Sequence, residues 1–358
     1  MRRKPIIALA LVAVIIVASV GAYYATAGKS DPDGPIDPTS VTITDSSGTS
    51  VTIEMPITAV AVTNTNAAKF MQVLGVADLV KGSEETTRTM LPEIYGDTDD
   101  IGKYSAPNGE DILSSGSKIL ITQFSSRGIT NYDELTAMGI KVIRLDMYGE
   151  TMLEDLQKFA SLFAPSAQEK ANEYIAMYTE VVDRVLALDT DSSDDPNFLF
   201  EFLSMKKPYS DNSELSKIAE SIGAVNCIGY LHPSATGATS DVQAAALLNW
   251  DKLNGIDYIL IRGTISDTST PQSQFDKFLA VDILYEEFTA IDAGHVYVID
   301  TDVLSGPLDY VGYVCIAIAL GLDVGDLDPS ALVADFNEKY GFSYGKTQFV
   351  FNVGPVPA

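Results

Sequence analysis

The stretch from Thr151 to about Leu188 constrains the fold of this chain more than any other. Thr151–Glu154 and Ser166–Glu169 both have the pattern of a capping box, in which a hydroxyl and a glutamate satisfy free N–H groups at a helix start. Apolar residues follow each box at helical spacing. The second helix, at roughly 22 residues of 1.5 Å each, would be about 33 Å long, the width of a small domain. We therefore predict two lobes joined by one long helix.

Strands and helices alternate on both sides of this connector. Val41–Ile53 has the alternating pattern of a β-hairpin. Further strand patterns, with helical patterns between them, lie at 57–63, 118–122, 141–145, 197–203, 258–261 and 295–299. Because strands that alternate with helices build parallel sheets, the sequence predicts an α/β fold of two Rossmann-like lobes bridged by a long helix.

The N-terminus has the pattern of an export segment. Three cations at residues 2–4 precede an uncharged, apolar run from Pro5 to Ala27, which is long enough to span a bilayer. Ala25–Ala27 offers a cleavage site, so residues 1–27 are either a signal peptide or a membrane anchor, and we favour the anchor. Repeated Asp-Pro and Asp-Gly pairs in residues 28–40 indicate a flexible stalk.

These patterns give a division of the whole chain. The expected segments are the signal or anchor (1–27), the stalk (28–40), an N-terminal substrate-binding lobe (41–150), the connecting helix (151–188), a C-terminal substrate-binding lobe (189–342) and a tail (343–358).

Composition excludes several functions. Lys and Arg number 23 against 49 Asp and Glu, a net charge of −26, which argues against nucleic acid or anionic lipid as a partner. With two His in the chain, neither a zinc site nor a Ser–His–Asp site is expected, and no Gly-x-Ser-x-Gly elbow is present. We predict no enzyme activity, no cofactor and no metal ligands. Cys227 and Cys315 are interpreted as buried free thiols, with a disulfide between them left open.

Two acids occupy related positions before buried strands. Glu110 precedes the strand that contains Ile121, and Asp251 precedes the strand that contains Ile261. We expect each acid in the first turn of a short helix, where the helix dipole favours negative charge.

Five motifs, in this order, resemble the substrate-binding proteins of ABC importers. They match the family's opening hairpin, the turn after its first helix, the helix that leads into a buried strand, the turn of the second lobe, and a late strand. The motifs are Val41–Ile53, Val73–Gly82, Pro107–Ile121, Ile222–Asn226 and Ala290–Asp300. The resemblance covers residues 41–340 and is specific to the class whose lobes are joined by one long helix, the siderophore, haem and cobalamin binders.

The resemblance implies partners and a location. In that family a carboxylate on each lobe docks to basic residues of the membrane permease. Glu110 occupies the first position, and Asp251 the second, with Asp241 as the competing register; either is shorter than the family's usual Glu. The resemblance implies a monomer on the extracellular face of the cytoplasmic membrane, anchored or secreted.

The ligand is expected between the lobes, beyond the carboxyl ends of the strands. Loops there offer two guanidinium groups that could hold an oxygen-rich ligand, several phenols and one loop histidine. The candidate ligand-binding residues are Asn64, Tyr104, Arg127, Tyr148, Tyr209, Tyr230, His232 and Arg262. The family favours an iron chelate of the ferric siderophore type. Cobalamin, haem, an oxyanion such as molybdate, and a surface protein without a transport role remain the alternatives.

Overall fold

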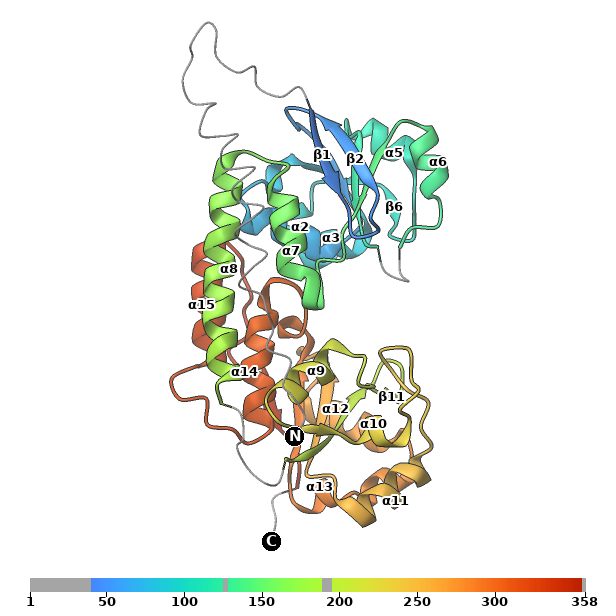
Figure 1. Ribbon diagram of the computed structural model, residues 1–358, viewed down its shortest axis with the longest axis vertical. Coiled ribbons are helices and arrows are strands. Elements are labelled where there is room, and N and C mark those ends of the chain that lie inside the picture. Colours follow the sequence, from blue (N-terminus) through green and yellow to red (C-terminus); the bar gives the residue numbers. More distant parts are fainter. Residues whose placement is uncertain (1–39, 125–127, 189–194, 356–358) are drawn as a thin grey trace, which may run out of the picture. The chain divides into compact units, whose positions relative to one another are not determined.

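The computed structural model describes residues 40–124, 128–188 and 195–355 (Figure 1). The predicted signal or anchor and almost all of the stalk lie outside the described residues. The chain divides into two compact units, the first comprising Met1–Asp146 and Leu153–Asn172, the second Met147–Met152 and Glu173–Ala358. Among the described residues, no helix is both long and apolar enough to cross a membrane.

The first unit is built on a parallel sheet of five strands in the order β5-β4-β3-β8-β9. These strands are β3 (Val60–Val62), β4 (Val80–Ser83), β5 (Asp99–Asp100), β8 (Ile119–Thr122) and β9 (Lys141–Arg144). The helices are α2 (Thr65–Val73), η1 (Ala77–Leu79), α3 (Glu85–Met90), α4 (Pro92–Tyr95), α5 (Gly109–Ser114) and α6 (Tyr132–Ala137). Two hairpins complete the unit, β1 (Ser40–Thr44) with β2 (Ser50–Glu54) and β6 (Gly102–Lys103) with β7 (Ala106–Pro107).

The predicted N-terminal hairpin is present and is tied to the sheet by an ion pair. The side chain of Asp45, at the turn of the hairpin, is fully buried and accepts from Arg144 Nε at 3.1 Å. Arg144 also lies over the ring of Tyr132, with Cζ 4.3 Å from its centroid. The hairpin is therefore anchored to the last strand of the sheet.

The connector contains two helices after a short 3-10 turn. These are η2 (Gly149–Thr151), α7 (Met152–Ala160) and α8 (Pro165–Leu186). The capping box predicted at Ser166 is wrong, because α8 already begins at Pro165, and proline favours the first position of a helix. From Glu173 onward α8 belongs to the second unit, where the Tyr174 hydroxyl donates to the Pro307 carbonyl at 3.0 Å and the Tyr174 ring lies 6.2 Å from that of Tyr340.

The second unit contains a mixed sheet in the order β11-β10-β13-β14-β15, with β12 also paired to β10. β12, β10, β13 and β14 are parallel, whereas β11 and β15 are antiparallel to their neighbours. The strands are β10 (Asn197–Phe202), β11 (Lys207–Pro208), β12 (Val225–Asn226), β13 (Tyr258–Gly263), β14 (Val296–Asp300) and β15 (Val350–Asn352). The helices are α9 (Glu214–Ser221), α10 (Cys227–Leu231), α11 (Ala244–Asn254), α12 (Pro271–Leu279), η3 (Ile283–Glu287), α13 (Thr289–Asp292), η4 (Thr301–Val303), η5 (Gly306–Leu308), α14 (Asp309–Ala319) and α15 (Pro329–Tyr340). The predicted α/β class is confirmed, and Cys227 and Cys315 are both buried and free.

One face of this sheet carries an ionisable residue inside an apolar core. Leu199, Ile261 and Val298 belong to a buried cluster on this face. Glu201 lies two residues after Leu199 in β10 and shares its face. Its side chain is completely buried, and neither carboxylate oxygen has a hydrogen-bond partner among the described residues. Burial raises the pKa of Glu201 to about 8, so the folded protein keeps this carboxyl protonated near neutral pH.

Glu201 therefore links stability to pH. Because its folded-state pKa lies above the ordinary value of 4.5, its contribution is complete below that value and is lost as pH rises toward 8. We expect Glu201→Gln to reduce the fall in unfolding free energy between pH 5 and pH 8 by on the order of 3 kcal/mol. Urea unfolding across this range measures the change. Burial also raises the pKa of Asp309 to about 8. Asp309 therefore maintains part of the pH dependence of the unfolding free energy in the Glu201→Gln variant.

Glu286→Gln is the matched control, because this glutamate is exposed on η3 of the same unit. It should leave the pH dependence as in the parent protein. An unchanged slope in Glu201→Gln would show that Glu201 is not protonated in the folded state.

Candidate functional site

The carboxyl ends of parallel strands meet at one edge of a sheet, which is where open α/β sheets bind ligands. In the second unit β10, β13 and β14 end at Phe202, Gly263 and Asp300. Arg262 pairs in register with Phe202, so the two side chains leave the same face of the sheet. This edge holds the candidate site of the second unit.

Arg262, Phe202 and Tyr209 form a stack at this edge. The Phe202 and Tyr209 rings are 5.3 Å apart and nearly parallel, at 7°. Arg262 Cζ lies 5.0 Å from the Phe202 centroid, and its Nη1 donates to the Tyr209 hydroxyl at 3.0 Å. The Nε of Arg262 is buried and has no hydrogen-bond partner within the described part of the chain. Arg262 as a whole is half-buried, and a guanidinium held flat in this way suits an oxygen acceptor on a ligand.

Tyr148 belongs to the same neighbourhood of the second unit. Burial raises the pKa of its hydroxyl to about 12, and the positive charge of Arg262 opposes that rise. Glu214 and Asp309 also act on it electrostatically. The structure thus brings together Tyr148, Tyr209 and Arg262, three of the residues predicted from sequence.

Sequence reasoning missed the acids of this neighbourhood. Asp309 is buried, accepts a hydrogen bond from Tyr178, and has an Oδ1 without a partner among the described residues. The signal that could have found it is an acid that opens an otherwise apolar helix, α14. Glu214, the first residue of α9, gave no signal beyond its favourable place at a helix start.

Two lysines along this edge, Lys217 and Lys346, are paired with carboxylates. Lys217 Nζ lies 3.2 Å from a Glu150 oxygen and 3.3 Å from a Glu214 oxygen. Lys346 Nζ lies 2.8 Å from Asp300 and 2.6 Å from Asp302. Each lysine therefore faces two carboxylates, and neither offers an uncompensated charge to a ligand.

The corresponding edge of the first unit is polar and internally bonded. Asn64 caps α2: its Oδ1 accepts from the N–H groups of Asn66 and Ala67 at 3.0 and 3.2 Å, and its Nδ2 donates to the Leu145 carbonyl at 2.9 Å. These bonds give the predicted ligand residue Asn64 a structural role. Arg127 lies outside the described residues.

Several large apolar side chains are exposed, at the end of α3, within α10 and on loops. In the first unit Met90, Tyr104 and Phe124 are 52%, 49% and 42% exposed. In the second unit Tyr230 is 61% exposed and lies 6.2 Å from the Trp250 ring. Singly exposed apolar side chains are normal on a protein surface, and a ligand with apolar surface could contact these.

His232 is held by its own unit. Its Nδ1 shares a hydrogen bond with the Ser240 hydroxyl, and its side chain is half-buried. Within the described ranges, no group of three or more His, Cys, Asp or Glu is placed to hold a metal ion.

The acids predicted to dock a permease differ in exposure. Glu110 is exposed in the first turn of α5, as expected. The expected position of Asp251 is wrong: it lies near the end of α11 and is 2% exposed. Asp251 accepts from the Ile256 N–H at 2.6 Å and from the Thr289 N–H at 2.9 Å, so it fixes two loops inside the unit. Asp241 is the exposed alternative, paired with Lys207 at 2.7 Å.

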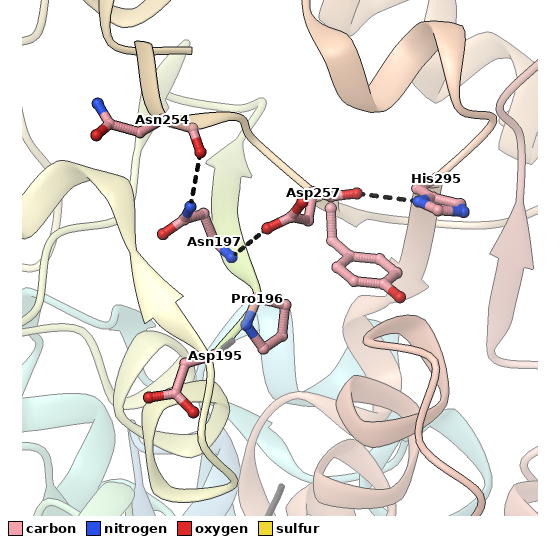
Figure 2. Close-up of a pocket in the computed structure, with 7 residues that line it drawn as sticks. Asp195, Pro196, Asn197, Asn254, Asp257 and His295 are labelled. Carbon is pink, nitrogen blue, oxygen red and sulfur yellow. Dashed lines mark hydrogen bonds between the residues drawn. The ribbon is translucent and has the colours of Figure 1, made fainter. Parts of the chain in front are cut away.

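A pocket of about 460 Å³ lies at the opposite edge of the second sheet (Figure 2). Its lining residues precede or begin the parallel strands, or end α11: Asp195, Pro196, Asn197, Asn254, Asp257, Tyr258 and His295. It is therefore not part of the site at the carboxyl ends.

Comparison with known proteins identifies the fold. No protein-family model matches the sequence, and no curated protein matches it either. The structure is similar to the TroA-like periplasmic binding protein FepB from Veillonella parvula, with a TM-score of 0.66 and 19% identity over 87% of this chain and 99% of that chain. It is similar to a periplasmic haem-binding protein from Pseudomonas aeruginosa, with a TM-score of 0.57 and 16% identity over 74% and 92% of the two chains. The molybdate-binding protein MolA from Haemophilus influenzae gives a TM-score of 0.61 and 16% identity over 85% and 99%.

The chain has the fold of the TroA-like periplasmic binding proteins, as the resemblance of its motifs predicts. The three solved structures named above are periplasmic binding proteins.

The hydrogen bonds of Asp251 predict a structural phenotype. We expect Asp251→Ala to lower the unfolding free energy by roughly 3 kcal/mol, because it removes a buried carboxylate that accepts from the Ile256 N–H, the Thr289 N–H and the Thr289 hydroxyl. Asp241→Ala, at an exposed ion pair, should change it by less than about 1 kcal/mol. Thermal and urea unfolding of both variants measure the difference. Equal stability of the two variants would contradict the structural role of Asp251.

Proposed function

We propose that this protein is an exported solute-binding protein of an ABC importer. It captures a bulky small-molecule ligand with the carboxyl edges of its two sheets and delivers the ligand to a membrane permease. It works as a monomer at the extracellular face of the cytoplasmic membrane, anchored or secreted through residues 1–27. The observation that carries the proposal is Arg262, whose guanidinium is stacked on Phe202 and bonded to the neutral Tyr209 hydroxyl at the carboxyl edge.

The proposed ligand is an iron chelate of the ferric siderophore type with low net negative charge. Within the described residues Arg262 has no carboxylate in an ion pair with it, while Lys217 and Lys346 each face two acids. The protein as a whole carries a net charge of −26, which repels polyanions. The exposed Met90, Tyr104 and Phe124 favour a ligand with apolar surface.

Haem, cobalamin and molybdate are the alternatives. The haem-binding and molybdate-binding neighbours have the same fold, so the fold alone does not separate them. Molybdate is small and has no apolar surface, which leaves the exposed aromatic side chains without a role. A surface protein without a transport role would bind none of these ligands.

A charge-matched ligand panel tests the proposal. We expect a neutral ferric trihydroxamate to raise the melting temperature more than a trianionic ferric tris-catecholate, haem, cobalamin or molybdate. A ligand at about 100 times its dissociation constant adds roughly 2.7 kcal/mol of stability, which a thermal-shift assay detects. Arg262→Gln should weaken the best ligand roughly ten- to a hundredfold, the effect of losing a charge-assisted hydrogen bond.

Arg184→Gln is the matched control, because Arg184 lies near the end of α8 in an exposed ion pair with Asp326. It should bind like the parent protein. A larger thermal shift with the trianionic chelate would overturn the proposal that the ligand has low net negative charge. No thermal shift with any ligand of the panel would favour the surface protein without a transport role.

Permease docking is tested separately from binding. We expect Glu110→Lys and Asp241→Lys to bind ligand normally but to lower uptake, because both acids are exposed and would meet a basic partner surface. Uptake by cells with the cognate permease, together with ligand affinity of the purified variants, measures the two effects. Glu54→Lys makes the same charge change at the end of β2 and is the control. Full uptake by both docking variants would refute these contact points.

A further inference from the structure

The pocket at the amino edge of the second sheet is separate from the proposed transport site. Asn197 begins β10 and Tyr258 begins β13, whereas Phe202 and Arg262 lie at the other ends of the same strands. A strand of this length spans roughly 17–20 Å, so one small ligand cannot contact both edges. Binding at the amino edge therefore does not depend on the proposed function.

The floor of the pocket is held by hydrogen bonds between its own loops. The Asn197 N–H donates to Asp257 Oδ2 at 2.7 Å, and its Nδ2 donates to the Asn254 carbonyl at 3.3 Å (Figure 2). The Asp257 N–H donates in turn to the Asn197 carbonyl at 2.9 Å. Because these bonds exist without a ligand, the lining is preorganised and loses little entropy on binding.

The lining selects for positive charge. Asp195 and Asp257 are both exposed carboxylates, and the seven lining residues include no lysine or arginine. Only one oxygen of Asp257 is used in the bond to Asn197. An anion would meet two carboxylates here, whereas a cation would be attracted both locally and by the net charge of −26.

One wall of the pocket is aromatic. The rings of Tyr258 and His295 are stacked, with centroids 5.0 Å apart and planes 13° apart. The His295 Nδ1 is hydrogen-bonded to the Asp257 carbonyl at 3.2 Å, which fixes the ring (Figure 2). Gly321, at a positive φ of 78°, leaves room for the tyrosine, since a Cβ there would lie 2.7 Å from the Tyr258 hydroxyl oxygen. A fixed tyrosine face attracts ammonium groups and flat apolar groups.

We propose that this pocket is a second binding site, which takes a small organic cation combining an ammonium group with a flat apolar group. Asp195 and Asp257 receive the ammonium, and the Tyr258–His295 pair packs against the flat group. The volume of about 460 Å³ is within the roughly 300–1,000 Å³ of small-molecule sites.

The test uses 2-phenylethylamine as the probe and neutral 2-phenylethanol as its control of the same shape. The chain has two histidines, so the ring signals of His295 and His232 can be assigned in a proton NMR spectrum with one His232→Gln variant. We expect the amine to shift the His295 signals saturably at concentrations up to about 10 mM. The His232 signals should not move, and the alcohol should have at least tenfold lower affinity.

Variants separate the carboxylates from bulk charge. The double variant Asp195→Asn, Asp257→Asn keeps an acceptor for the Asn197 N–H and should bind the amine at least tenfold more weakly. Asp267→Asn, on the exposed turn after β13, removes an acid elsewhere in the unit and should bind like the parent protein. Equal affinity for amine and alcohol, an unaffected double variant, competition by inorganic phosphate, or no saturable shift of His295 would each overturn the proposal.

Discussion

Parallel hydrogen bonding between β10, β13 and β14 is the constraint on which the second unit depends. Pairing of Phe198 with Tyr258, and of Phe202 with Arg262, fixes both ends of the two strands in one register. A strand slipped by one residue would turn Arg262 to the opposite face and place a buried isoleucine at the edge. The register therefore decides which side chains meet at each edge of the sheet. Because the strands are parallel, their two ends form two separate edges, one with the carboxyl-edge site and the other with the amino-edge pocket.

The acidic residues show how partners decide the role of a charge. Asp45 faces Arg144, and Asp251 faces two backbone N–H groups, so both stabilise loops. Glu201 has neither a cation nor an N–H group as a partner among the described residues, and burial keeps it protonated instead. The exposed Glu110 side chain is not used in this way to stabilise a loop within the described residues. A net charge of −26 is thus a sum over acids with different environments, and only the exposed ones set the field that a ligand meets.

Sequence predicted the long elements well and the short ones poorly. The spacing of apolar residues predicts α8 and the buried strands, because burial on one face imposes a period. The two-residue strands β11 and β12 have no period and were missed. Asp251 was misplaced because α11 is longer than the short helix expected before a buried strand. The positions of Arg262 and Tyr209 beside strand ends predict them as ligand-binding candidates. Their contact with each other depends on the antiparallel pairing of β11 with β10, which no local sequence pattern indicates.

Charge compensation along the carboxyl edge gives Arg262 its significance. A lysine between two carboxylates has a field that nearly cancels a few ångströms away, so it adds little to ligand affinity. Arg262 instead donates one hydrogen bond to the neutral Tyr209 hydroxyl and lies over the Phe202 ring. Neither contact neutralises its positive charge. The guanidinium plane is also fixed by the stack, so a ligand that accepts from this group is oriented as well as attracted. A fixed cation beside acids discriminates by the position of an acceptor more than by total negative charge, and this is the physical basis for expecting a weakly charged ligand.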